Sequence, residues 1–492
     1  MAFLTQAANR GSISTGYDIE YSNKFESDNT EGILRNYDAS TGANCIANNS
    51  TTNPKKFTVS YWVKLTELLA SGQNIPWVAI AGGYATVVKF QDEQFAVYDD
   101  NAGWSLKTNA KFRDTAAWYH LVCAVDTTQS TAANRVKLYV NGVVQTSFAT
   151  ENYGTQNADN QLWRTNTGHA VGAASYFKGG YIAELHVIDG TQYAASDFGE
   201  FDENSGIWKP KEADVTYGGQ GYYINWSDYA SANSNANNTG IGKDFSGNTN
   251  PFVNLNNWSS ADIATDTPTN NFSTLNTLMA EELIPVYYTV TEGGTNQVSS
   301  KAGYGCSAGT IGVSKGKWYY EVKFSSNFSY GQIGVIDTAS MASVDMNLSP
   351  GQTPYGVGWF SGNGGVNVDG SYDSGAAFGQ NFPSYDHNDI IGCAIDVDNN
   401  KLYFHKNGTY GNSGNPTSGA TGTGAVPLST AGEGTWHVST NAYYGYAQTN
   451  QGGYTSMSIS SAASDANGYG TFEYAPPSGY YSLCTKNLAE FG

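Results

Sequence analysis

The stretch that decides the fold is WYHLVCAVD (118–126), followed after a polar turn by RVKLYVNG (135–142). It predicts a buried strand ending in Asp, a turn, a strand containing Lys-Leu-Tyr, and a tight Asn-Gly turn. Asn-Gly accepts the positive backbone dihedrals of a two-residue hairpin loop. The same order returns in DIIGCAIDVDNN (389–400) and KLYFHKNG (401–408). We therefore expect two copies of one β-architecture, one in each half of the chain.

The rest of the chain has the same character. Short apolar or alternating runs are separated by clusters of Gly, Asn and Asp, which is typical of sandwiches and barrels. The 492 residues include 57 Gly and 35 Tyr, which suit turns and pleated strands respectively. Helical and heptad signals are almost absent. We predict an all-β protein, with almost no helix and more than one domain.

Composition breaks suggest the domain limits. Residues 1–15 are predicted to be an exposed attachment arm and residues 16–228 the first set of strands. A Gly/Asn/Ser-rich connecting segment is expected over 229–271, and a second set of strands over 272–492.

Charge and cysteine content exclude several classes of protein. The net charge is −19 and only 14% of residues are charged, against roughly 25% in an average soluble protein. Such a chain repels phosphate backbones, so we expect no nucleic-acid partner. No apolar run approaches the ~20 residues of a membrane helix, so no membrane insertion is expected. Cys123 and Cys393 lie in apolar runs and are predicted to be buried. With no secretory signal in MAFLTQAANRGS (1–12) and no disulfide framework, we expect folding in a reducing cytoplasm.

The first half resembles laminin-G-like, concanavalin-A-like domains. The matching blocks are FTVSYWVKL (57–65), WYHLVCAVD (118–126), VKLYVNGVV (136–144) and GGYIAELHVIDG (179–190). They occur in the order of the family, with Asn141 where many members have Asp. The resemblance implies a β-sandwich of the jelly-roll kind. It is also compatible with a structural Ca²⁺ in this domain, although no ligands can be assigned.

The second half resembles SPRY domains. GKWYYEVKF (316–324) matches their opening strand, and HNDIIGCAIDVDNNKLYFHKNG (387–408) contains their central hairpin. Three more blocks complete the match in the expected order: QIGVID (332–337), YGVGW (355–359) and FEYAPPSGYYSLC (472–484). SPRY domains are also concanavalin-A-like β-sandwiches. The fold prediction is therefore two such sandwiches in tandem.

Short phrases resemble structural proteins of marine tailed phages that combine these two domains: RGSISTGYDIEYSNKF (10–25), DTPTNNFSTLN (266–276) and YAPPSGYYSLCTKNL (474–488). This resemblance implies a virion protein similar to a tail fibre, made in the host cytoplasm and released by lysis. It also implies contact with other virion proteins through the N-terminal arm, and a homo-oligomer, with a trimer favoured.

One motif raises the question of catalysis. Glu26-Ser27-Asp28-Asn29-Thr30-Glu31 matches the E-x-D-x-x-E letters of laminarinase-type glycoside hydrolases. An inner strand would be apolar at alternate positions, whereas Ser27, Asn29 and Thr30 are polar, so we predict an exposed turn and no enzyme. Asp396, Asp398 and Asn400 alternate as in calcium loops, but they lack the following Gly and distant Glu of an EF-hand, so a hairpin turn is predicted. No cofactor is expected.

Aromatic loops are the candidate ligand-binding features, since rings can lie under the apolar faces of sugars while polar groups bind hydroxyls. The predicted rim residues of the second domain are Tyr355, Trp359, Tyr372, Tyr385, His387, Trp436, Tyr443, Tyr444 and Tyr446, with Phe360 beside them. Trp359 and Trp436 also fit strand patterns that would place them in the core. Such loops mark protein contacts as readily as glycan contacts.

The leading hypothesis is a non-enzymatic virion structural protein, most simply a tail-fibre or appendage adhesin that contacts host-surface polysaccharide or protein. Three alternatives remain open: a decoration protein of the capsid or virion surface, a cellular lectin-like binding protein, and a glycan depolymerase. A sandwich fold alone does not distinguish them.

Overall fold

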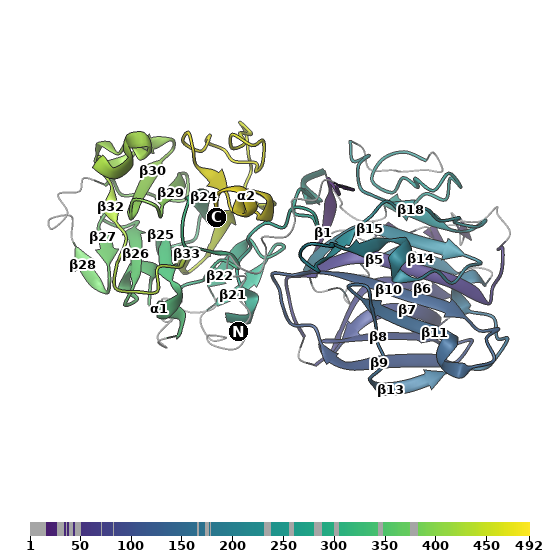
Figure 1. Ribbon diagram of the computed structural model, residues 1–492. Coiled ribbons are helices and arrows are strands. Elements are labelled where there is room, and N and C mark those ends of the chain that lie inside the picture. Colours follow the sequence, from purple (N-terminus) through teal and green to yellow (C-terminus); the bar gives the residue numbers. More distant parts are fainter. Residues whose placement is uncertain are drawn as a thin grey trace. The chain divides into compact units, whose positions relative to one another are not determined.

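A computed structural model describes residues 16–26, 34–35, 37–38, 43–44, 51–69, 71–81, 83–164, 167–172, 177, 179–230, 238–254, 260–279, 288–299, 305–342, 348–373 and 382–492. The chain forms two compact units, Ser14–Thr269 and Asn270–Gly492, here called the N-terminal and C-terminal sandwiches. Both are built from β-sheets whose strands are almost all antiparallel (Figure 1), and the predicted all-β class is confirmed. Helical residues are few in the described part of the chain: α1 (Thr338–Ala342), α2 (Thr485–Phe491), short 3₁₀ turns and a stretch at 277–279.

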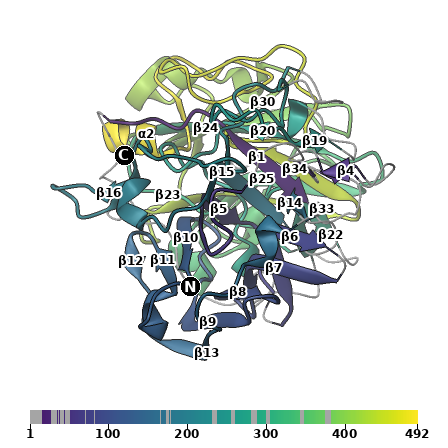
Figure 2. The ribbon, with the colours of Figure 1, turned by 90° about the vertical axis from the view of Figure 1, so that its right-hand side faces the viewer.

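The N-terminal sandwich contains two eight-stranded sheets, several of whose strands are labelled in Figure 2. The first has the order β12 (Val143–Val144), β11 (Val136–Val140), β10 (Trp118–Asp126), β5 (Lys56–Leu65), β15 (Gly179–Asp189), β1 (Ser22–Glu26) and β20 (Ile263–Ala264), with β18 (Tyr222–Ile224) beside β15. The second has the order β13 (Phe148–Tyr153), β9 (Trp104–Lys111), β8 (Gln94–Asp99), β7 (Tyr84–Gln91), β6 (Gln73–Ala81), β14 (Gly168–Val171), β2 (Leu34–Arg35) and β19 (Val253–Asn254). Two small pairs complete it, β16 (Gly199–Phe201) with β17 (Trp208–Pro210) and β3 (Tyr37–Asp38) with β4 (Ala43–Asn44).

Aromatic contacts join the two sheets. The ring of Phe57 on β5 packs 6.1 Å from that of Trp104 on β9, and Trp77 on β6 donates a hydrogen bond to the Tyr222 hydroxyl on β18. Every residue of β10 and β15 is buried, because the outer face of the first sheet is covered as well. Residues 193–217 supply that cover, and they include Tyr193, Phe198 and Trp208. The two strands are therefore buried along their whole length and do not alternate between buried and exposed residues.

The C-terminal sandwich pairs a nine-stranded sheet with a six-stranded one. The larger has the order β21 (Tyr288–Thr291), β22 (Asn296–Ser299), β34 (Tyr446–Asn450), β24 (Lys317–Phe324), β29 (Ile390–Asp396), β30 (Lys401–Lys406) and β31 (Thr409–Tyr410), with β32 (Val426–Pro427) beside β30 and β35 (Tyr481–Ser482) parallel to β24. The smaller has the order β23 (Gly312–Val313), β33 (Trp436–Tyr443), β25 (Tyr330–Asp337), β26 (Gly356–Phe360), β27 (Val366–Val368) and β28 (Ser371–Asp373).

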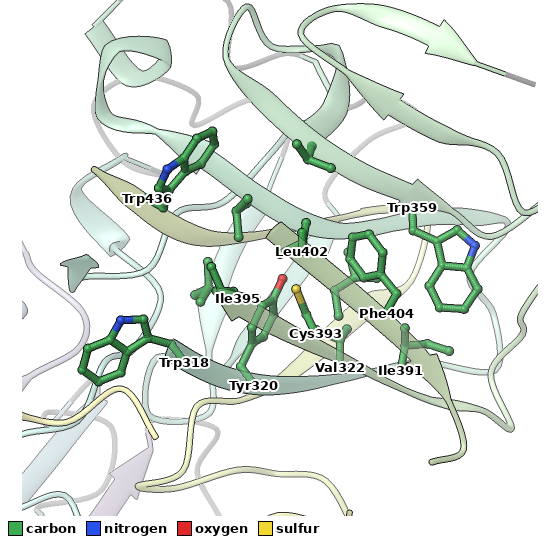
Figure 3. Close-up of a cluster of buried hydrophobic side chains, with 14 of the residues drawn as sticks. Trp318, Tyr320, Val322, Trp359, Ile391, Cys393, Ile395, Leu402, Phe404 and Trp436 are labelled. Carbon is green, nitrogen blue, oxygen red and sulfur yellow. The ribbon is translucent and has the colours of Figure 1, made fainter. Parts of the chain in front are cut away.

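The core of the C-terminal sandwich lies between these sheets. Figure 3 shows Trp359 and Trp436 at opposite ends of the buried cluster, with Tyr320 and Cys393 between them. The outer face of the nine-stranded sheet is also covered, by Phe472 and Tyr480 from the C-terminal segment. The prediction that Cys123 and Cys393 are buried is confirmed.

The two predicted hairpins are present. Val140 pairs with Val143 across Asn141 and Gly142, and Lys406 pairs with Thr409 across Asn407 and Gly408. Both Asn-Gly turns have positive φ angles, of 47° and 77° in the first and 50° and 78° in the second. These are the dihedrals that two-residue hairpin loops require.

The segment 229–271, expected to connect the domains, differs from a free linker. Its described part adds β19 and β20 to the sheets of the N-terminal sandwich. Within it, the buried Asp266 accepts from Lys64 Nζ at 2.7 Å and Trp118 Nε1 at 3.0 Å. The Gly/Asn/Ser composition therefore marks turns within a packed segment. The predicted arm, residues 1–15, lies outside the described residues, and no helix among those described could span a membrane.

Candidate binding surface

Three of the nine predicted rim residues belong to the core. Trp359 and Trp436 are 0% and 1% exposed, and Tyr385 is 5% exposed. The Tyr385 hydroxyl donates to the carbonyl oxygens of Gly331 and Trp359, at 3.1 and 2.8 Å. Tyr385 therefore ties the loop before β29 to strands β25 and β26. These three side chains support a surface and cannot form one.

Three other predicted residues do reach the surface together. Tyr443 ends β33, Tyr444 lies in the turn that follows, and Tyr446 begins β34. This turn crosses from the six-stranded to the nine-stranded sheet. Tyr444 and Tyr446 are 48% and 36% exposed, while Tyr443 is half-buried.

Tyr330, the first residue of β25, joins this group through long-range pairing. It lies opposite Tyr443 in the register of β25 and β33, with ring centroids 6.4 Å apart. The Tyr330 ring also stacks on Phe360 at 5.5 Å, and Tyr443 meets Tyr444 edge-on at 4.9 Å. We call Tyr330, Phe360, Tyr443, Tyr444 and Tyr446 the aromatic patch. Tyr330 was not predicted, because only the register between distant strands brings it here.

The aromatic patch is where the C-terminal sandwich concentrates its exposed apolar surface. Its well-exposed large hydrophobic side chains, within the described residues, are Tyr330, Tyr444 and Tyr446. Single exposed hydrophobic residues are ordinary, whereas their convergence at one end of a domain marks a contact surface.

The turn at the centre of the patch has an unusual backbone. Tyr444 has a φ of 60° and Gly445 a φ of 68°. A bulky residue rarely adopts the left-handed region, and such strain is concentrated at functional sites. Ser325 holds the turn in place, since its Oγ accepts from the Tyr446 amide at 2.9 Å. A Cβ on Gly445 would overlap the same Oγ. The exposed Tyr444 ring is therefore displayed from a fixed support.

The remaining predicted rim residues lie elsewhere. Tyr355 precedes β26 at the end opposite Phe360, and His387 lies in the turn before β29; both are half-buried. Tyr372 belongs to β28, where it pairs with Asn367, but its side chain lies outside the described residues. The predicted set therefore does not form one site, and its Tyr443–Tyr446 portion is what the structure brings together.

The structure describes only part of the two motifs that raised the questions of catalysis and metal binding. Glu26 ends β1, and the following residues 27–33 lie outside the described ones. Asp396 accepts from the Asn399 amide, and Asp398 from the Gly316 amide, in the turn between β29 and β30, so the predicted hairpin turn is confirmed. In the described part of the chain, no three His, Cys, Asp or Glu side chains converge as metal ligands.

The N-terminal sandwich contains a polar cluster that the sequence did not reveal. Glu184 occupies a bulge of β15 with a φ of 50° and is almost completely buried. Its carboxylate accepts from the hydroxyls of Tyr17 and Tyr223, each at 2.8 Å. His186 stacks on Tyr223 with centroids 4.3 Å apart. Burial, reinforced by the negative charge of Glu184, raises the pKa of Tyr17. The carboxylate is thus fully engaged in closing one end of the core.

Comparison with known proteins supports the first of the two predicted domain types. Residues 38–195 match the sequence profile of a family described as the concanavalin A-like lectin/glucanases superfamily, Laminin_G_3. This range contains all four sequence blocks of the laminin-G-like resemblance, including the last one at 179–190. The N-terminal sandwich is therefore a concanavalin-A-like domain.

Other comparisons cover smaller parts. An ATP-dependent RNA helicase, DDX1 of Xenopus laevis, is 36% identical over 108 residues, which is 22% of this chain and 13% of the helicase. Similar solved structures include the SPRY domain of human HERC1 (13% identity, TM-score 0.23, 33% of this chain and 91% of that chain). They also include stonustoxin (14%, 0.26, 36% and 27%) and a heptameric SAP-like pentraxin of Limulus polyphemus (12%, 0.25, 36% and 80%).

Proposed function

We propose that this protein is a non-enzymatic structural component of a bacteriophage particle, a tail-fibre or appendage adhesin. Its C-terminal sandwich contacts host-surface glycan or protein through the aromatic patch. The observation that carries the proposal is that the exposed Tyr330 lies opposite Tyr443, which leads directly into the exposed Tyr444 and Tyr446, at one end of the C-terminal sandwich.

The chemistry of the patch suits recognition. Tyr supplies a large, stiff ring with a polar hydroxyl, which gains contact area at a small entropic cost and serves both glycan and protein partners. The rings lean on one another and on strands β25 and β33, so little order has to be gained on binding. A lightly charged, acidic chain limits non-specific adhesion. The family matched by the N-terminal sandwich, described by lectins and glucanases together, is consistent with contact to glycan.

A second function, decoration of the capsid or virion surface, is favoured by a separate feature of the N-terminal sandwich. Val143 and Val144 are exposed on the edge strand β12, and Phe201 and Ile207 are exposed on the adjacent β16–β17 hairpin. The Trp208 ring of that hairpin lies against Gly142, directly before Val143. Exposed apolar residues beside an open strand edge suit contact with other virion proteins or with further copies of the chain.

Electron microscopy of intact particles labelled with an antibody against residues 272–492 separates these functions. The adhesin proposal predicts label on the tail and loss of host adsorption when the antibody is bound. Label spread evenly over the head, with adsorption unaffected, contradicts it and favours decoration.

A further inference from the structure

A cleft lies beside the second Asn-Gly hairpin, on the C-terminal sandwich. It has a volume of about 510 Å³ and is lined by Pro383, Lys406, Asn407, Thr409, Tyr410, Gly411, Asn412 and Ser413. Ligand pockets typically measure ~300–1,000 Å³, so this cleft is of a size to hold one or two sugar rings. None of its lining residues belongs to the aromatic patch.

The charged and amide groups of the cleft are engaged within the protein. Lys406 Nζ lies 2.8 Å from Asp389 Oδ2 and donates to the Ser384 carbonyl at 3.0 Å. Asn407 accepts from the Ile390 amide and donates to Asp389. An anionic ligand would have to compete with Asp389 for Lys406. A cationic ligand would have to compete with Lys406 for Asp389. The pairing therefore favours an uncharged ligand.

Hydroxyl groups and a ring make up much of the remaining wall. Thr409 and Ser413 are exposed, and Tyr410 is half-buried, with its ring edge-on to His405 at 5.2 Å and packed against the buried cluster that includes Phe472. Hydroxyls can both donate and accept, and the partly buried ring adds an apolar border to them. This combination matches a ligand that is itself rich in hydroxyl groups.

The backbone of the cleft wall is strained. Asn412 has φ and ψ of 53° and 31°, and Ser413 follows with a φ of 53°. Asn tolerates this left-handed conformation, whereas Ser adopts it much less readily. The turn is fixed from below, since a Cβ on Gly411 would overlap the Phe382 ring. The fold therefore maintains a strained turn at the wall of a cleft, the pattern of a pre-organised binding site.

We infer that this cleft binds one unit of an uncharged saccharide. The inference goes beyond the proposed function, because the cleft and the aromatic patch consist of different residues. Ligand binding at each can therefore be tested with separate variants. The cleft and the aromatic patch lie on either side of the segment that contains Ser384 and Tyr385. The Tyr385 hydroxyl bonds to the carbonyls of Gly331 and Trp359 near the patch, and Lys406 bonds to the Ser384 carbonyl beside the cleft.

The test uses the full chain on an array of neutral oligosaccharides, with sialylated and sulfated oligosaccharides as the charged comparison. Thr409→Trp fills the cleft from an exposed position on the edge strand β31. Thr289→Trp is its matched control, an exposed threonine on β21 at the opposite edge of the same sheet. We expect binding to neutral oligosaccharides, a loss of at least tenfold in Thr409→Trp, and no change in Thr289→Trp.

Ser413→Gly gives a second test that does not depend on how the bulky variant folds. Glycine relieves the left-handed strain, so the thermal midpoint should stay level or rise while saccharide affinity falls at least threefold. Two results overturn the inference: no neutral oligosaccharide binding above the charged set, or binding that survives both variants. Tyr444→Ser should leave intact the oligosaccharide binding that Thr409→Trp removes, so failure of the cleft and failure of the aromatic patch are distinguishable.

Discussion

In the N-terminal sandwich the chain leaves β11 through Asn141 and Gly142, and in the C-terminal sandwich it leaves β30 through Asn407 and Gly408. Each Asn side-chain oxygen accepts from a backbone amide of the preceding strand, that of His120 at 2.7 Å or Ile390 at 2.9 Å. The same turn is thus braced in the same way twice.

The agreement extends to the strand ends and to the outer faces. Asp126 pairs with Lys56 at 3.2 Å, and Asp396 pairs with Lys317 at 3.0 Å. In each sandwich a later aromatic ring covers the turn glycine. Trp208 lies over Gly142, and Tyr474 lies over Gly408.

The sandwiches diverge directly after this shared turn. One continues into the short exposed edge strand β12, and the other continues into β31 and the strained turn that lines the cleft. Residues before the turn serve stability, whereas those after it are available for contacts. The comparison teaches that the hairpin is common scaffold and that its continuation differs between the two copies.

The largest effect should come from placing a side chain under the covering rings. Gly142→Ala should destabilise the N-terminal sandwich by about 3–4 kcal/mol, because the left-handed backbone and the overlap with Trp208 both oppose a Cβ. Trp208 cannot easily move, as its Nε1 donates to His120 Nδ1 at 3.1 Å. Gly408→Ala should cost less, about 2 kcal/mol, since its Cβ would lie 2.8 Å from the half-buried Tyr474 ring. Hydrogen-exchange mass spectrometry measures the stability of each sandwich separately. If Gly142→Ala costs no more stability than Gly408→Ala, the rings of Trp208 and Tyr474 do not account for the difference between the two turns.

Removing the charge at the strand ends should have a similar effect in both copies. Asp126→Asn and Asp396→Asn should each destabilise their own sandwich by about 2 kcal/mol, less than a fully buried pair because the lysines are partly exposed. Denaturant unfolding monitored by hydrogen exchange measures both. A loss in only one sandwich would break the proposed equivalence of these ion pairs.

One position in the same register differs in chemistry. Four residues after the paired lysine, the N-terminal sandwich has Ser60 and the C-terminal sandwich has Glu321. Burial raises the pKa of Glu321 to about 7, although hydrogen bonds from the Glu473 and Tyr474 amides partly oppose the shift. The folded state therefore holds this proton more tightly than the unfolded state, so stability from this site is full below about pH 4.5 and is lost as pH rises through about 7.

Glu321→Gln should remove that pH dependence. The free energy of unfolding of the native chain minus that of the variant should fall by about 3 kcal/mol between pH 4.5 and pH 8. The difference isolates Glu321 from the buried His405, whose pKa burial lowers to about 3 and which acts in the opposite sense as pH falls. A difference that stays flat with pH contradicts this assignment.

The smallest effect is expected at the Tyr444 turn, which belongs only to the C-terminal sandwich. Tyr444→Gly should raise stability by about 0.5–1 kcal/mol, because glycine adopts a φ of 60° without strain and the exposed ring contributes little burial. Thermal denaturation measures the change, with Tyr84→Gly as the control at an exposed position of β7 that has no left-handed backbone. Destabilisation at Tyr444 comparable to that at Tyr84 would mean that the turn is not strained.

The parts predicted from sequence are those set by neighbours in the chain. The Asn-Gly turns, the strands around Cys123 and Cys393, and the all-β class follow from local pattern. Trp359 and Trp436 could not be placed securely, because a strand residue faces the core or the solvent according to which sheets cover it. Tyr330 could not be found at all, since its place beside Tyr443 depends on pairing between β25 and β33. Similarly, the polar composition of 229–271 gave no sign that Asp266 is buried against Lys64.

The most direct test of the adhesin proposal compares binding of the labelled full chain to cells that the particle infects. The triple variant Tyr330→Ser, Tyr444→Ser and Tyr446→Ser removes the exposed rings of the aromatic patch. The control Tyr84→Ser removes a still more exposed ring from the N-terminal sandwich. The proposal predicts at least a tenfold loss of cell binding in the triple variant and none in Tyr84→Ser. Binding by the triple variant at the level of the unaltered chain would contradict it.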